Sequence, residues 1–534
     1  MVSQQQERED KFDVGLGFVV PELSDLLPEG GRVEAATYAL DNTYYDTPDQ
    51  DLLRLRLTLR RRVGGPDAGW HLKVPSGRAR TEVHSKARTR AVPKALADLV
   101  RGVRRGQELA PVVNLKTSRD VLRLLDADGA LLAEIADDHV QSSTLGEQST
   151  LASWREVEVE LGAAGDEQLL ATIGQRLVEW GANPASHASK LQRALGSTPR
   201  VQPLPDETGH PDERGQTDET GQTDETGQTD DAGQSADAAQ PADAGQPDAA
   251  GKPAEPESEP NQVSRVVTDY VSVQCREIVL GDLGLRLGRS VVHPTRVAIR
   301  RLRSTLRVFG TLFDPEEAAR LEVELVWYAG LLGEVRDRDV LTERLVDQVA
   351  ALPAEFVLGP VAAQIESTLG AERALHLRRL TKTLGSDRYL ALLETLGRWR
   401  VDPPLTEAAA APAAEVKTYV KKAQRKLNRK LRSAGGDHVE LHSARKAGKR
   451  FRYAAELAEP VLGKWATRSV DEGKTLQELL GEHQDSVVSA EFLRRLGAAA
   501  GVAQDQNGFT YGILLAAEWR RAEQIRQELE QRYG

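Results

Sequence analysis

The chain has 534 residues, of which 40% are hydrophobic and 28% charged, and its formal net charge is -11. This length is too great for one core and predicts two or three folded units. No apolar run approaches the roughly 20 residues that span a bilayer, and we expect a soluble protein. The first 15 residues show no secretory signal, and the single cysteine, Cys275, excludes an internal disulfide and Cys-based zinc sites. We expect a cytoplasmic protein.

The first informative pattern is Glu7-x-Glu9-x-Lys11, which has a charged side chain at every second position. On a β-strand these three side chains point to one side. Charges on the inner face of a strand are costly unless a ligand compensates them. A divalent cation held by the two glutamates, with a phosphate bound by the lysine, would compensate them. For this motif alone the alternative is a solvated, charged tail.

Most of the first 200 residues follow a strand pattern. Residues 53–62 alternate apolar and cationic side chains at period two, and residues 64–67 (Gly-Gly-Pro-Asp) form a turn signal. The pattern predicts an α+β unit rich in antiparallel strands. Its other predicted elements are strands at 70–74, 131–135 and 154–161 and short helices at 93–101 and 167–179.

Several of these strands carry charges on a single face. Glu156, Glu158 and Glu160 alternate with apolar residues, and Arg60 and Arg62 share a face of their own strand. The default explanation of any one such strand is a surface strand with its polar residues outward. Matched acidic and basic faces on several strands are better explained by a closed barrel with a charged interior. A polyanion and a metal ion would neutralise that interior.

Residues 201–262 have the composition of a linker. Residues 201–260 hold sixteen Asp and Glu against two basic residues, a net charge of -14, and the rest of the chain then has 68 basic and 65 acidic residues, or +3. The Gly-Gln-Thr-Asp repeats that begin at Gly215 contain no apolar residue with which to form a core. We expect this segment to be a disordered, extended spacer.

Residues 263–534 follow a helical pattern rich in Leu, Ala, Arg and Glu. One predicted helix, 293–307, carries cationic residues at spacings of three and four, which places them on one helix face. Like charges at this spacing repel, so the face needs an anion to cover it. The stripe consists of His293, Arg296, Arg300, Arg303 and Arg307.

The helical half contains an internal duplication. Residues 441–453 repeat the cationic pattern about 149 positions later, and 331–337 (Leu-Leu-Gly-Glu-Val-Arg-Asp) match 479–485 (Leu-Leu-Gly-Glu-His-Gln-Asp) at an offset of 148. The agreement predicts a pseudo-symmetric all-α helical bundle with its two cationic helices side by side, forming a basic surface. We expect Asp337 and Asp485 to pair with the arginines of the stripe.

A further helix around 421–429 extends this cationic surface or is simply a solvated face; its cations are Lys421, Lys422, Arg425 and Arg429. Nucleic-acid binding is disfavoured because the stripe lacks aromatic residues on which bases could stack. Regularly spaced arginines suit a repeating phosphate chain instead. Metal binding by His293 and His442 is also disfavoured, because neither has a second His or a carboxylate three or four residues later.

An ordered set of motifs runs through residues 1–200. In chain order the motifs are Glu7-x-Glu9-x-Lys11, 44–48 (Tyr-Tyr-Asp-Thr-Pro), 59–62 (Leu-Arg-Arg-Arg), Lys73, Lys116, Arg119, Glu134, Asp138, 156–160 (Glu-x-Glu-x-Glu) and Ser189-Lys190. This set resembles the CYTH, or triphosphate-tunnel, family. The resemblance implies an eight-stranded antiparallel β-tunnel over residues 1–200 that binds a triphosphate and usually hydrolyses it with a metal ion.

The resemblance also implies roles for individual residues. Phosphate oxygens would be bound by Lys11, Arg60, Arg62, Lys73, Lys116, Arg119 and Lys190. Mg²⁺ or Mn²⁺ would be held by Glu7, Glu9, Glu158 and Glu160, with Glu134 and Asp138 near a second metal ion. The catalytic set would be Glu7, Glu9, Lys11 and Glu156. Arg80 and Glu82 align only loosely and are candidates.

The helical motifs, together with 386–389 (Ser-Asp-Arg-Tyr), resemble the CHAD domain over residues 263–534. That resemblance implies a module that binds inorganic polyphosphate. Its groove would be lined by His293, Arg296, Arg300, Arg303, Arg307, His442, Arg445, Lys446, Lys449 and Arg452.

Both resemblances together imply a Mg²⁺- or Mn²⁺-dependent phosphohydrolase that cleaves inorganic triphosphate, or a related triphosphate, and binds polyphosphate through its helices. One alternative is a non-catalytic polyphosphate-binding protein that is targeted to polyphosphate granules. Another is adenylate-cyclase-like activity on ATP, although no base-recognition motif supports it. The four carboxylates Glu7, Glu9, Glu158 and Glu160 favour catalysis, because anion binding alone would not require them.

Overall fold

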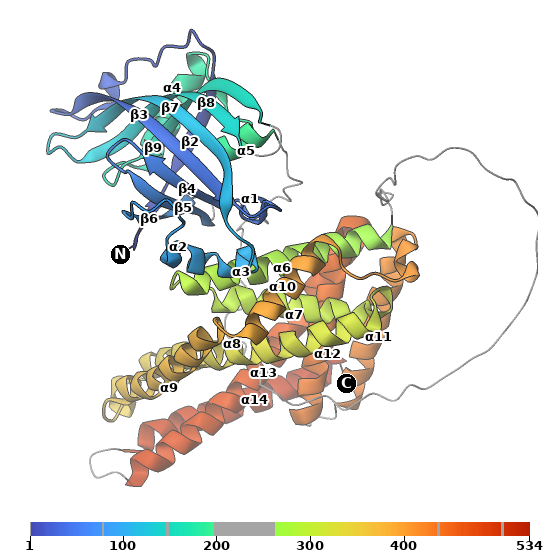
Figure 1. Cartoon of the computed structure of the whole chain (residues 1–534). Coiled ribbons are helices and arrows are strands. Elements are labelled where there is room, and N and C mark those ends of the chain that lie inside the picture. Colours follow the sequence, from blue (N-terminus) through green and yellow to red (C-terminus); the bar gives the residue numbers. More distant parts are fainter. Residues whose placement is uncertain are drawn as a thin grey trace, which may run out of the picture. The chain divides into compact units, whose positions relative to one another are not determined.

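The computed structural model describes residues 2–76, 79–145, 149–196, 262–434, 438–502 and 507–533. The chain divides into two compact units, Met1–His210 and Pro211–Gly534 (Figure 1). The predicted linker, 201–262, lies outside the described residues apart from Gln262. No helix in the described part of the chain combines the length and apolar character that crossing a membrane requires.

The first unit is built around one antiparallel sheet. Its neighbours run β1-β6-β5-β4-β3-β7-β8-β9-β2-β10. The strands are β1 (Val2–Glu7), β2 (Glu9–Val14), β3 (Arg32–Asp46), β4 (Thr58–Val63), β5 (Gly69–Ser76), β6 (Ala79–Ser85), β7 (Ala110–Leu125), β8 (Leu131–Thr144), β9 (Leu151–Leu161) and β10 (Asn183–Pro184). Its short helices are η1 (Ser24–Leu26), α1 (Asp51–Arg54), α2 (Lys94–Leu99), α3 (Arg101–Arg104), α4 (Glu167–Glu179) and α5 (Lys190–Leu195).

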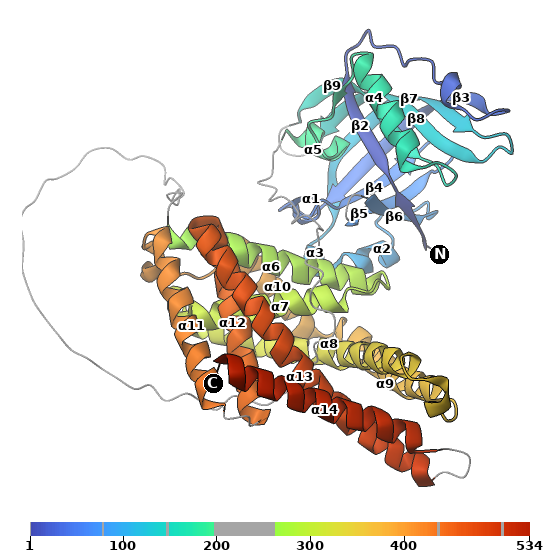
Figure 2. The same ribbon diagram turned by 180° about the vertical axis from the view of Figure 1, so that it is seen from behind.

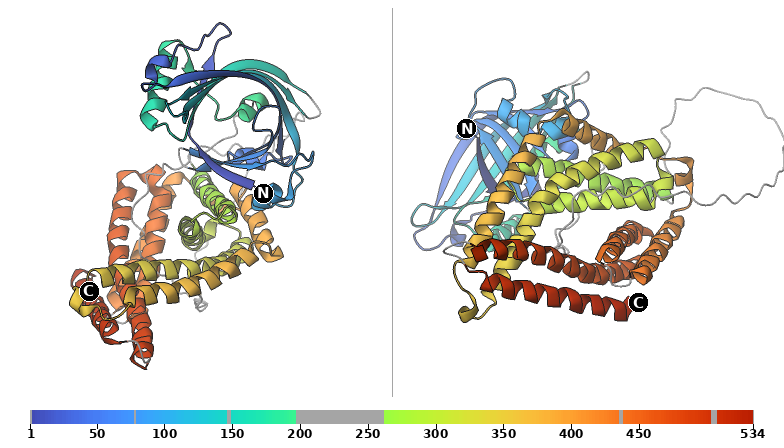
Figure 3. Two further views of the ribbon diagram at one scale, coloured as in Figure 1. Left: turned by 90° about the vertical axis from the view of Figure 1, so that its left-hand side faces the viewer. Right: turned by 90° about the horizontal axis from the view of Figure 1, so that it is seen from below.

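The two ends of the sheet meet at the N-terminal segment. Only Arg8 separates β1 from β2; β1 pairs with β6, and β2 pairs with β9. If β1 and β2 are counted as one continuous strand that includes Arg8, the sheet has eight strands and closes into a ring. Figure 3 (left) shows this ring end-on. The two-residue β10 adds to β2 at its end. The expected eight-stranded antiparallel tunnel is therefore present.

Helices pack on both surfaces of the ring. On the outer surface, Ile173 and Leu177 of α4 pack against Val157 and Val159 of β9. On the inner surface, Leu191 of α5 packs against residues that share the strand face of Arg119, among them Val113, Leu115 and Val140. Because α5 packs inside the ring, it also brings its first residue, Lys190, into the lumen.

One predicted strand is shorter than expected. Residues 53–62 were expected to be extended throughout, but 51–54 form α1 and β4 begins only at Thr58. The cause is Asp46, which is buried and accepts hydrogen bonds from the backbone N–H groups of Thr47 (2.7 Å), Leu52 (2.9 Å) and Leu53 (3.0 Å). These bonds hold the chain in a helical turn despite its alternating pattern.

The second unit is entirely helical in the described residues. Its helices are α6 (Val263–Arg286), α7 (Val292–Val308), α8 (Pro315–Ala350), α9 (Val361–Thr383), α10 (Asp387–Val401), α11 (Val416–Ser433), α12 (His438–Leu462), α13 (Lys464–Val502) and α14 (Phe509–Tyr533). Short 3-10 turns lie between them at η2 (Gly310–Leu312), η3 (Ala354–Phe356), η4 (Glu407–Ala410) and η5 (Ala413–Glu415).

The order of these helices repeats, as the sequence offset predicts. The cationic helix α7 precedes the hairpin α8–α9, and the cationic helix α12 precedes the hairpin α13–α14. Figures 1 and 2 show both hairpins extending in the same direction. The two cationic helices, α7 and α12, pack against each other, as do α6 with α7 and α11 with α12.

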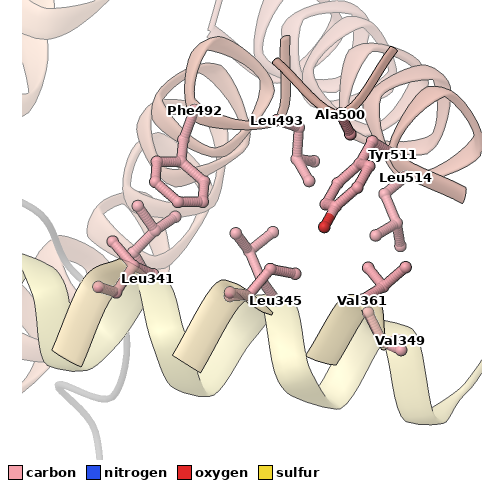
Figure 4. Close-up of a cluster of buried hydrophobic side chains, with 11 residues drawn as sticks. Leu341, Leu345, Val349, Val361, Phe492, Leu493, Ala500, Tyr511 and Leu514 are labelled. Atoms are coloured by element: carbon pink, nitrogen blue, oxygen red, sulfur yellow. The ribbon is translucent and has the colours of Figure 1, made fainter. Parts of the chain in front are cut away.

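A shared core joins the two hairpins (Figure 4). Leu341 and Leu345 of α8 face Phe492 and Leu493 of α13, and Tyr511 of α14 closes the cluster. The Tyr511 hydroxyl donates a hydrogen bond to Oε1 of Gln364 at 2.8 Å, so its polar end is satisfied beside this apolar core. The hairpins are thereby held as one body.

Replacing Asp46 tests its role in ending the predicted strand. Asp46→Ala leaves three buried N–H groups without an acceptor, so we expect the free energy of unfolding of this region to fall by about 2–4 kcal/mol. The change in this free energy is measured by hydrogen exchange of peptides from residues 44–60 at increasing urea concentration. The exposed neighbour Asp49→Ala is the control, and equal effects of both changes would contradict the assignment.

The contact between α6 and α7 depends on Gly281. A Cβ atom there would lie 2.1 Å from Oγ1 of Thr295. Gly281→Ala must push the helices apart, and we expect it to lower the free energy of unfolding by about 1–3 kcal/mol. Gly370→Ala in α9 meets no atom within 4 Å and should instead stabilise the helix by about 0.5–1 kcal/mol. Thermal melting of the two variants should shift in opposite directions; shifts of the same sign would disprove the packing argument.

Candidate functional site

The lumen of the ring contains a polar cavity of about 390 Å³. Residues from each of the strands β1 to β9 line this cavity, together with Lys190 of α5. Most of the predicted tunnel residues meet there: Glu7, Glu9, Lys11, Arg60, Arg62, Lys73, Arg119, Glu134, Glu158, Glu160 and Lys190, together with the loosely aligned Arg80 and Glu82.

One wall of the cavity is acidic because two strands pair in register. Glu9 of β2 lies opposite Glu160 of β9, and Lys11 lies opposite Glu158. Like charges directly opposite each other are destabilising. Lys11 relieves this repulsion, since its Nζ lies 3.1 Å from Oε2 of Glu9 and also pairs with Glu158.

Lys73 of β5 compensates Glu7, which also belongs to this wall, and is a second cation near Glu9. Its Nζ lies 2.5 Å from Oε2 of Glu7 and 3.8 Å from Oε2 of Glu9. Burial alone would raise the pKa of Glu9, but the charges of Lys73 and Lys11 outweigh it and lower that pKa to about 2. Glu9 is therefore ionised at neutral pH.

Glu160 is the carboxylate whose compensation is weakest. Burial, followed by the negative charges of Glu7, Glu9 and Glu134, outweighs the attraction of Lys73 and raises the pKa of Glu160 to about 7. A group with this pKa carries about half a charge at neutral pH. The acidic wall thus holds more negative charge than its lysines compensate, which is where an added cation is most favourable.

The opposite wall is cationic and held by its own carboxylates. Arg62 donates from Nε to Oδ1 of Asn42 (2.9 Å) and pairs through Nη1 with Oδ2 of Asp67 (2.5 Å). Burial, with the neighbouring charge of Arg60, lowers the pKa of Arg62 to about 10, so it remains charged at neutral pH. Arg60 lies 3.7 Å from Glu82. Because burial and the charge of Arg60 disfavour the charged form of Arg62, an added anion beside it would be favourable.

Behind the cavity lies a tight ionic cluster. Arg119 forms a bidentate pair with Asp138 at 2.6 and 2.7 Å. Nζ of Lys190 lies 2.5 Å from Glu156, 2.7 Å from Glu158 and 3.0 Å from Asp138. These carboxylates fix the two cations that face the lumen.

Two residues with predicted roles in the cavity, Asp138 and Glu156, lie too deep in the structure to line it. Asp138, expected near a metal ion, and Glu156, expected in catalysis, do not line the cavity; their side chains are 0% and 7% exposed. Lys190 covers both of them, because α5 packs inside the ring. Both lie on the inward face of the sheet, as Arg119 does, but they pair with Arg119 and Lys190 and do not reach the cavity.

Lys116 is misplaced by the sequence prediction. It lies three residues before Arg119 on β7, whose register is unbroken there, so the two side chains point to opposite faces of the sheet. Lys116 is exposed and lines a second hollow, of about 790 Å³, with His139 and Arg155. It is not part of the set of cations in the polar cavity.

The acidic wall fits a hard divalent cation by donor chemistry. Glu7, Glu9 and Glu160 offer only oxygen ligands, which Mg²⁺ and Mn²⁺ prefer, and the raised pKa of Glu160 marks uncompensated negative charge. Within the described residues, no group of three or more His, Cys, Asp or Glu already has the arrangement to hold a metal ion. Lys11 and Lys73 occupy the spaces between these carboxylates.

In the helical unit the predicted cationic stripes lie on α7 and α12, which pack together. Four of the ten predicted residues are buried: Arg296 (4% exposed), Arg445 (2%), Lys449 (8%) and Arg452 (3%). Arg303 and Arg307 are more exposed and pair with Glu322. The expected pairing of Asp337 is present, with Arg296 at 3.7 Å.

The helix α11 contributes to this cationic region through Arg429, which the sequence analysis named, and through Lys426 and Lys430, which it did not name. Burial, followed by the charges of Arg450, Arg429, Lys430 and Arg307, lowers the pKa of Lys426. Three helices, α7, α11 and α12, therefore bring cations close enough to repel one another. The neglected signal was helical spacing, since Lys426 lies four residues after Lys422 and three before Arg429.

The sequence prediction also missed His71. It is 1% exposed, its Nδ1 lies 3.0 Å from Oε1 of Glu82, and its Nε2 lies 2.8 Å from the carbonyl oxygen of Asp67. Burial lowers the pKa of His71. His71 thus connects Glu82, the partner of Arg60, with Asp67, the partner of Arg62. It lies two residues before Lys73 on the same strand, and this spacing could have predicted that its side chain faces inward.

Comparisons with known proteins agree with both halves. A model of the CYTH domain matches residues 17–194, and a model of the CHAD domain matches residues 270–494. The chain is 33% identical over 551 positions to two Mycobacterium tuberculosis proteins, uncharacterized protein MT2285 of strain CDC 1551 and uncharacterized protein Rv2226 of strain H37Rv. Each alignment covers 98% of this chain and 95% of the relative.

Among solved structures, PptA from Streptomyces chartreusis is similar at 20% identity, covering 51% of this chain and 98% of that protein, with a TM-score of 0.44. The CHAD domain from the plant Ricinus communis is similar at 26% identity, covering 51% of this chain and 92% of that protein, with a TM-score of 0.39. Given the two domain matches and the relatives aligned over almost its whole length, the chain belongs to the CYTH–CHAD fusion proteins.

Proposed function

We propose that the CYTH domain hydrolyses inorganic triphosphate, or a related triphosphate, with the help of Mg²⁺ or Mn²⁺, and that the CHAD domain binds inorganic polyphosphate. The observation that carries the first part is the convergence of an acidic and a cationic wall on one 390 Å³ cavity. A triphosphate with a divalent cation presents both signs of charge at this scale, which neither a neutral ligand nor a simple anion does.

The cationic side of the cavity would bind the phosphate groups. Arg60, Arg62, Lys73, Arg119 and Lys190 are held by carboxylates and so are placed before any ligand arrives. Fixed cations stabilise the charge that develops on the flanking oxygens during phosphoryl transfer without reorganising. Their positions would also align the terminal phosphorus for attack by water.

The acidic side would hold the metal through Glu7, Glu9, Glu158 and Glu160. When bound, the metal ion would activate a water molecule and neutralise the phosphate charge. Lys11 bridges Glu9 and Glu158 and would leave these carboxylates for a phosphate oxygen. Glu9 is already ionised, whereas Glu160 must lose its proton, since burial and its acidic neighbours raise its pKa to about 7.

The second part of the proposal rests on the two packed cationic helices. Burial, followed by the charges of cations on α7, α11 and α12, lowers the pKa of Lys426, so these cations lie close enough to repel it. A polyanion with regularly spaced charges would relieve this repulsion. Inorganic polyphosphate fits this surface better than nucleic acid does, because the stripe contains no aromatic residue for base stacking.

Removing the acidic wall tests the hydrolase directly. Phosphate release from tripolyphosphate, ATP and long-chain polyphosphate is measured with Mg²⁺ or Mn²⁺ for the wild type and for Glu7→Gln/Glu9→Gln. We expect metal-dependent turnover of tripolyphosphate that falls about 10²–10³-fold in the variant, because the metal loses two charged ligands. The exposed Glu34→Gln, also on a strand of the ring, is the control.

Two other outcomes would replace this proposal. Tight binding of tripolyphosphate without turnover of any substrate would indicate a binding protein. Release of pyrophosphate from ATP would indicate a cyclase.

Weakening the stripe tests polyphosphate binding. Arg303→Gln/Arg307→Gln removes two of its partly exposed cations, and we expect the affinity for long-chain polyphosphate to fall about tenfold, with a shallower dependence on salt. Titration at several salt concentrations measures both. The control is Arg320→Gln/Arg494→Gln, which removes two exposed arginines elsewhere on the helices. If the control loses as much affinity for polyphosphate, the effect comes from the net charge of the protein and not from the stripe.

A further inference from the structure

A small side pocket adjoins the tunnel cavity. Its volume is about 180 Å³. Three residues, Thr58, Arg80 and Ser189, line both the side pocket and the tunnel cavity, so the two spaces are neighbours separated by these side chains at most. The remaining lining consists of Leu53, Arg56, Ser186, Ala188 and Gln192.

The charge of the side pocket differs from that of the tunnel. The described residues that line it include two arginines, Arg56 and Arg80, and no carboxylate, whereas seven Asp and Glu line the tunnel cavity. Arg80 lies at the junction: Nη2 donates to the carbonyl oxygen of Ala188 at 2.7 Å, and Nε lies 3.9 Å from Oε1 of Glu9. The lining of the side pocket therefore favours an anion, next to the acidic wall of the tunnel.

Arg56 is held in an uncommon backbone conformation beside this pocket. Its φ is 59°, in the left-handed region that disfavours residues with a Cβ. Its N–H donates to the carbonyl oxygen of Leu53 at 2.8 Å, and the N–H of Leu57 donates to that of Leu52 at 2.9 Å, which fixes the turn. Strain of about 1–2 kcal/mol is thus retained where a guanidinium lines the pocket.

The remaining lining decides the class of ligand. The hydroxyls of Thr58, Ser186 and Ser189 and the amide of Gln192 are donors suited to phosphate oxygens. A nucleobase would need a flat apolar or aromatic partner, and Leu53 is the one large apolar residue among those that line the pocket. Phosphate fits this lining better than a base does.

We propose that the side pocket receives a fourth phosphate group, so that the tunnel acts on inorganic phosphate chains of four or more units. The first three groups would lie in the tunnel cavity and the chain would continue past Arg80 towards Arg56. This inference rests on the proposed triphosphatase function and names the substrates that the tunnel would prefer, which are phosphate chains longer than tripolyphosphate.

The test compares selectivity between two substrates. We measure kcat/KM for tetrapolyphosphate and for tripolyphosphate with Mg²⁺ for the wild type, Arg56→Gln and Arg56→Lys. We expect the wild type to prefer tetrapolyphosphate, and Arg56→Gln to lower that preference about tenfold. Arg56→Lys should restore part of it, because the charge is kept. Arg54→Gln, exposed and two residues away, should keep the wild-type preference.

Other results would overturn the assignment. An equal fall for both substrates, or none, would show that Arg56 does not contact a fourth phosphate. If kcat/KM is also measured with ATP and falls in Arg56→Gln for ATP alone, the pocket would be assigned to a nucleoside.

The outcome is separable from that of the proposed function. If the wild type hydrolyses neither substrate, the triphosphatase proposal fails, but the affinities of the same variants for the two chains, measured by titration calorimetry, still test the pocket. A tenfold loss for tetrapolyphosphate alone would support the pocket, and equal affinities throughout would reject it.

Discussion

The structure of the CYTH domain depends on one constraint: in a closed sheet, every second residue of a strand must face the lumen. Here those residues are largely charged, and water cannot compensate them as it would at a surface. Most of these charges are therefore paired with a charge of opposite sign: Lys11 pairs with Glu9 and Glu158, and Lys73 pairs with Glu7. These pairs place a cationic and an acidic wall on either side of one cavity.

The compensation is incomplete, and this is what gives the cavity its chemistry. Ion pairs in a buried site rarely repay their full desolvation cost, so a protein that keeps them in such number is expected to use them. Glu160 has the clearest deficit, with its pKa raised to about 7 by burial and by its acidic neighbours. The same physics applies in the CHAD domain, where burial, followed by neighbouring cations, lowers the pKa of Lys426. Each domain thus has a charge imbalance that a phosphate chain, with or without a metal ion, would reduce.

Much of this arrangement could be predicted from the sequence because it follows from periodicity. The alternation of Glu156, Glu158 and Glu160 indicates a charged strand face, and the 148-residue offset between two helical motifs predicts the repeated hairpins. The misplacement of Lys116 was avoidable, since it and Arg119 are an odd number of residues apart on one strand.

The remaining errors come from contacts between distant segments. The depth of Asp138 and Glu156 is set by α5, which carries Lys190 into the ring from far along the chain. The turn at residues 51–54 is set by hydrogen bonds to Asp46. No local pattern reports either contact, nor does one report the burial of Arg445 between packed helices. Which inward-facing residues reach the cavity is therefore a tertiary property.

The central claim is that the two walls hold a metal ion and a phosphate chain together. Its most direct test is a crystal structure with Mn²⁺ and tripolyphosphate, in which the anomalous signal of manganese locates the metal. Our account predicts manganese among Glu7, Glu9 and Glu160, phosphate groups against Arg60 and Arg62, and Lys11 moved away from Glu158 to a phosphate oxygen. Manganese or phosphate found only outside the tunnel, with the Lys11 pairs intact, would contradict it.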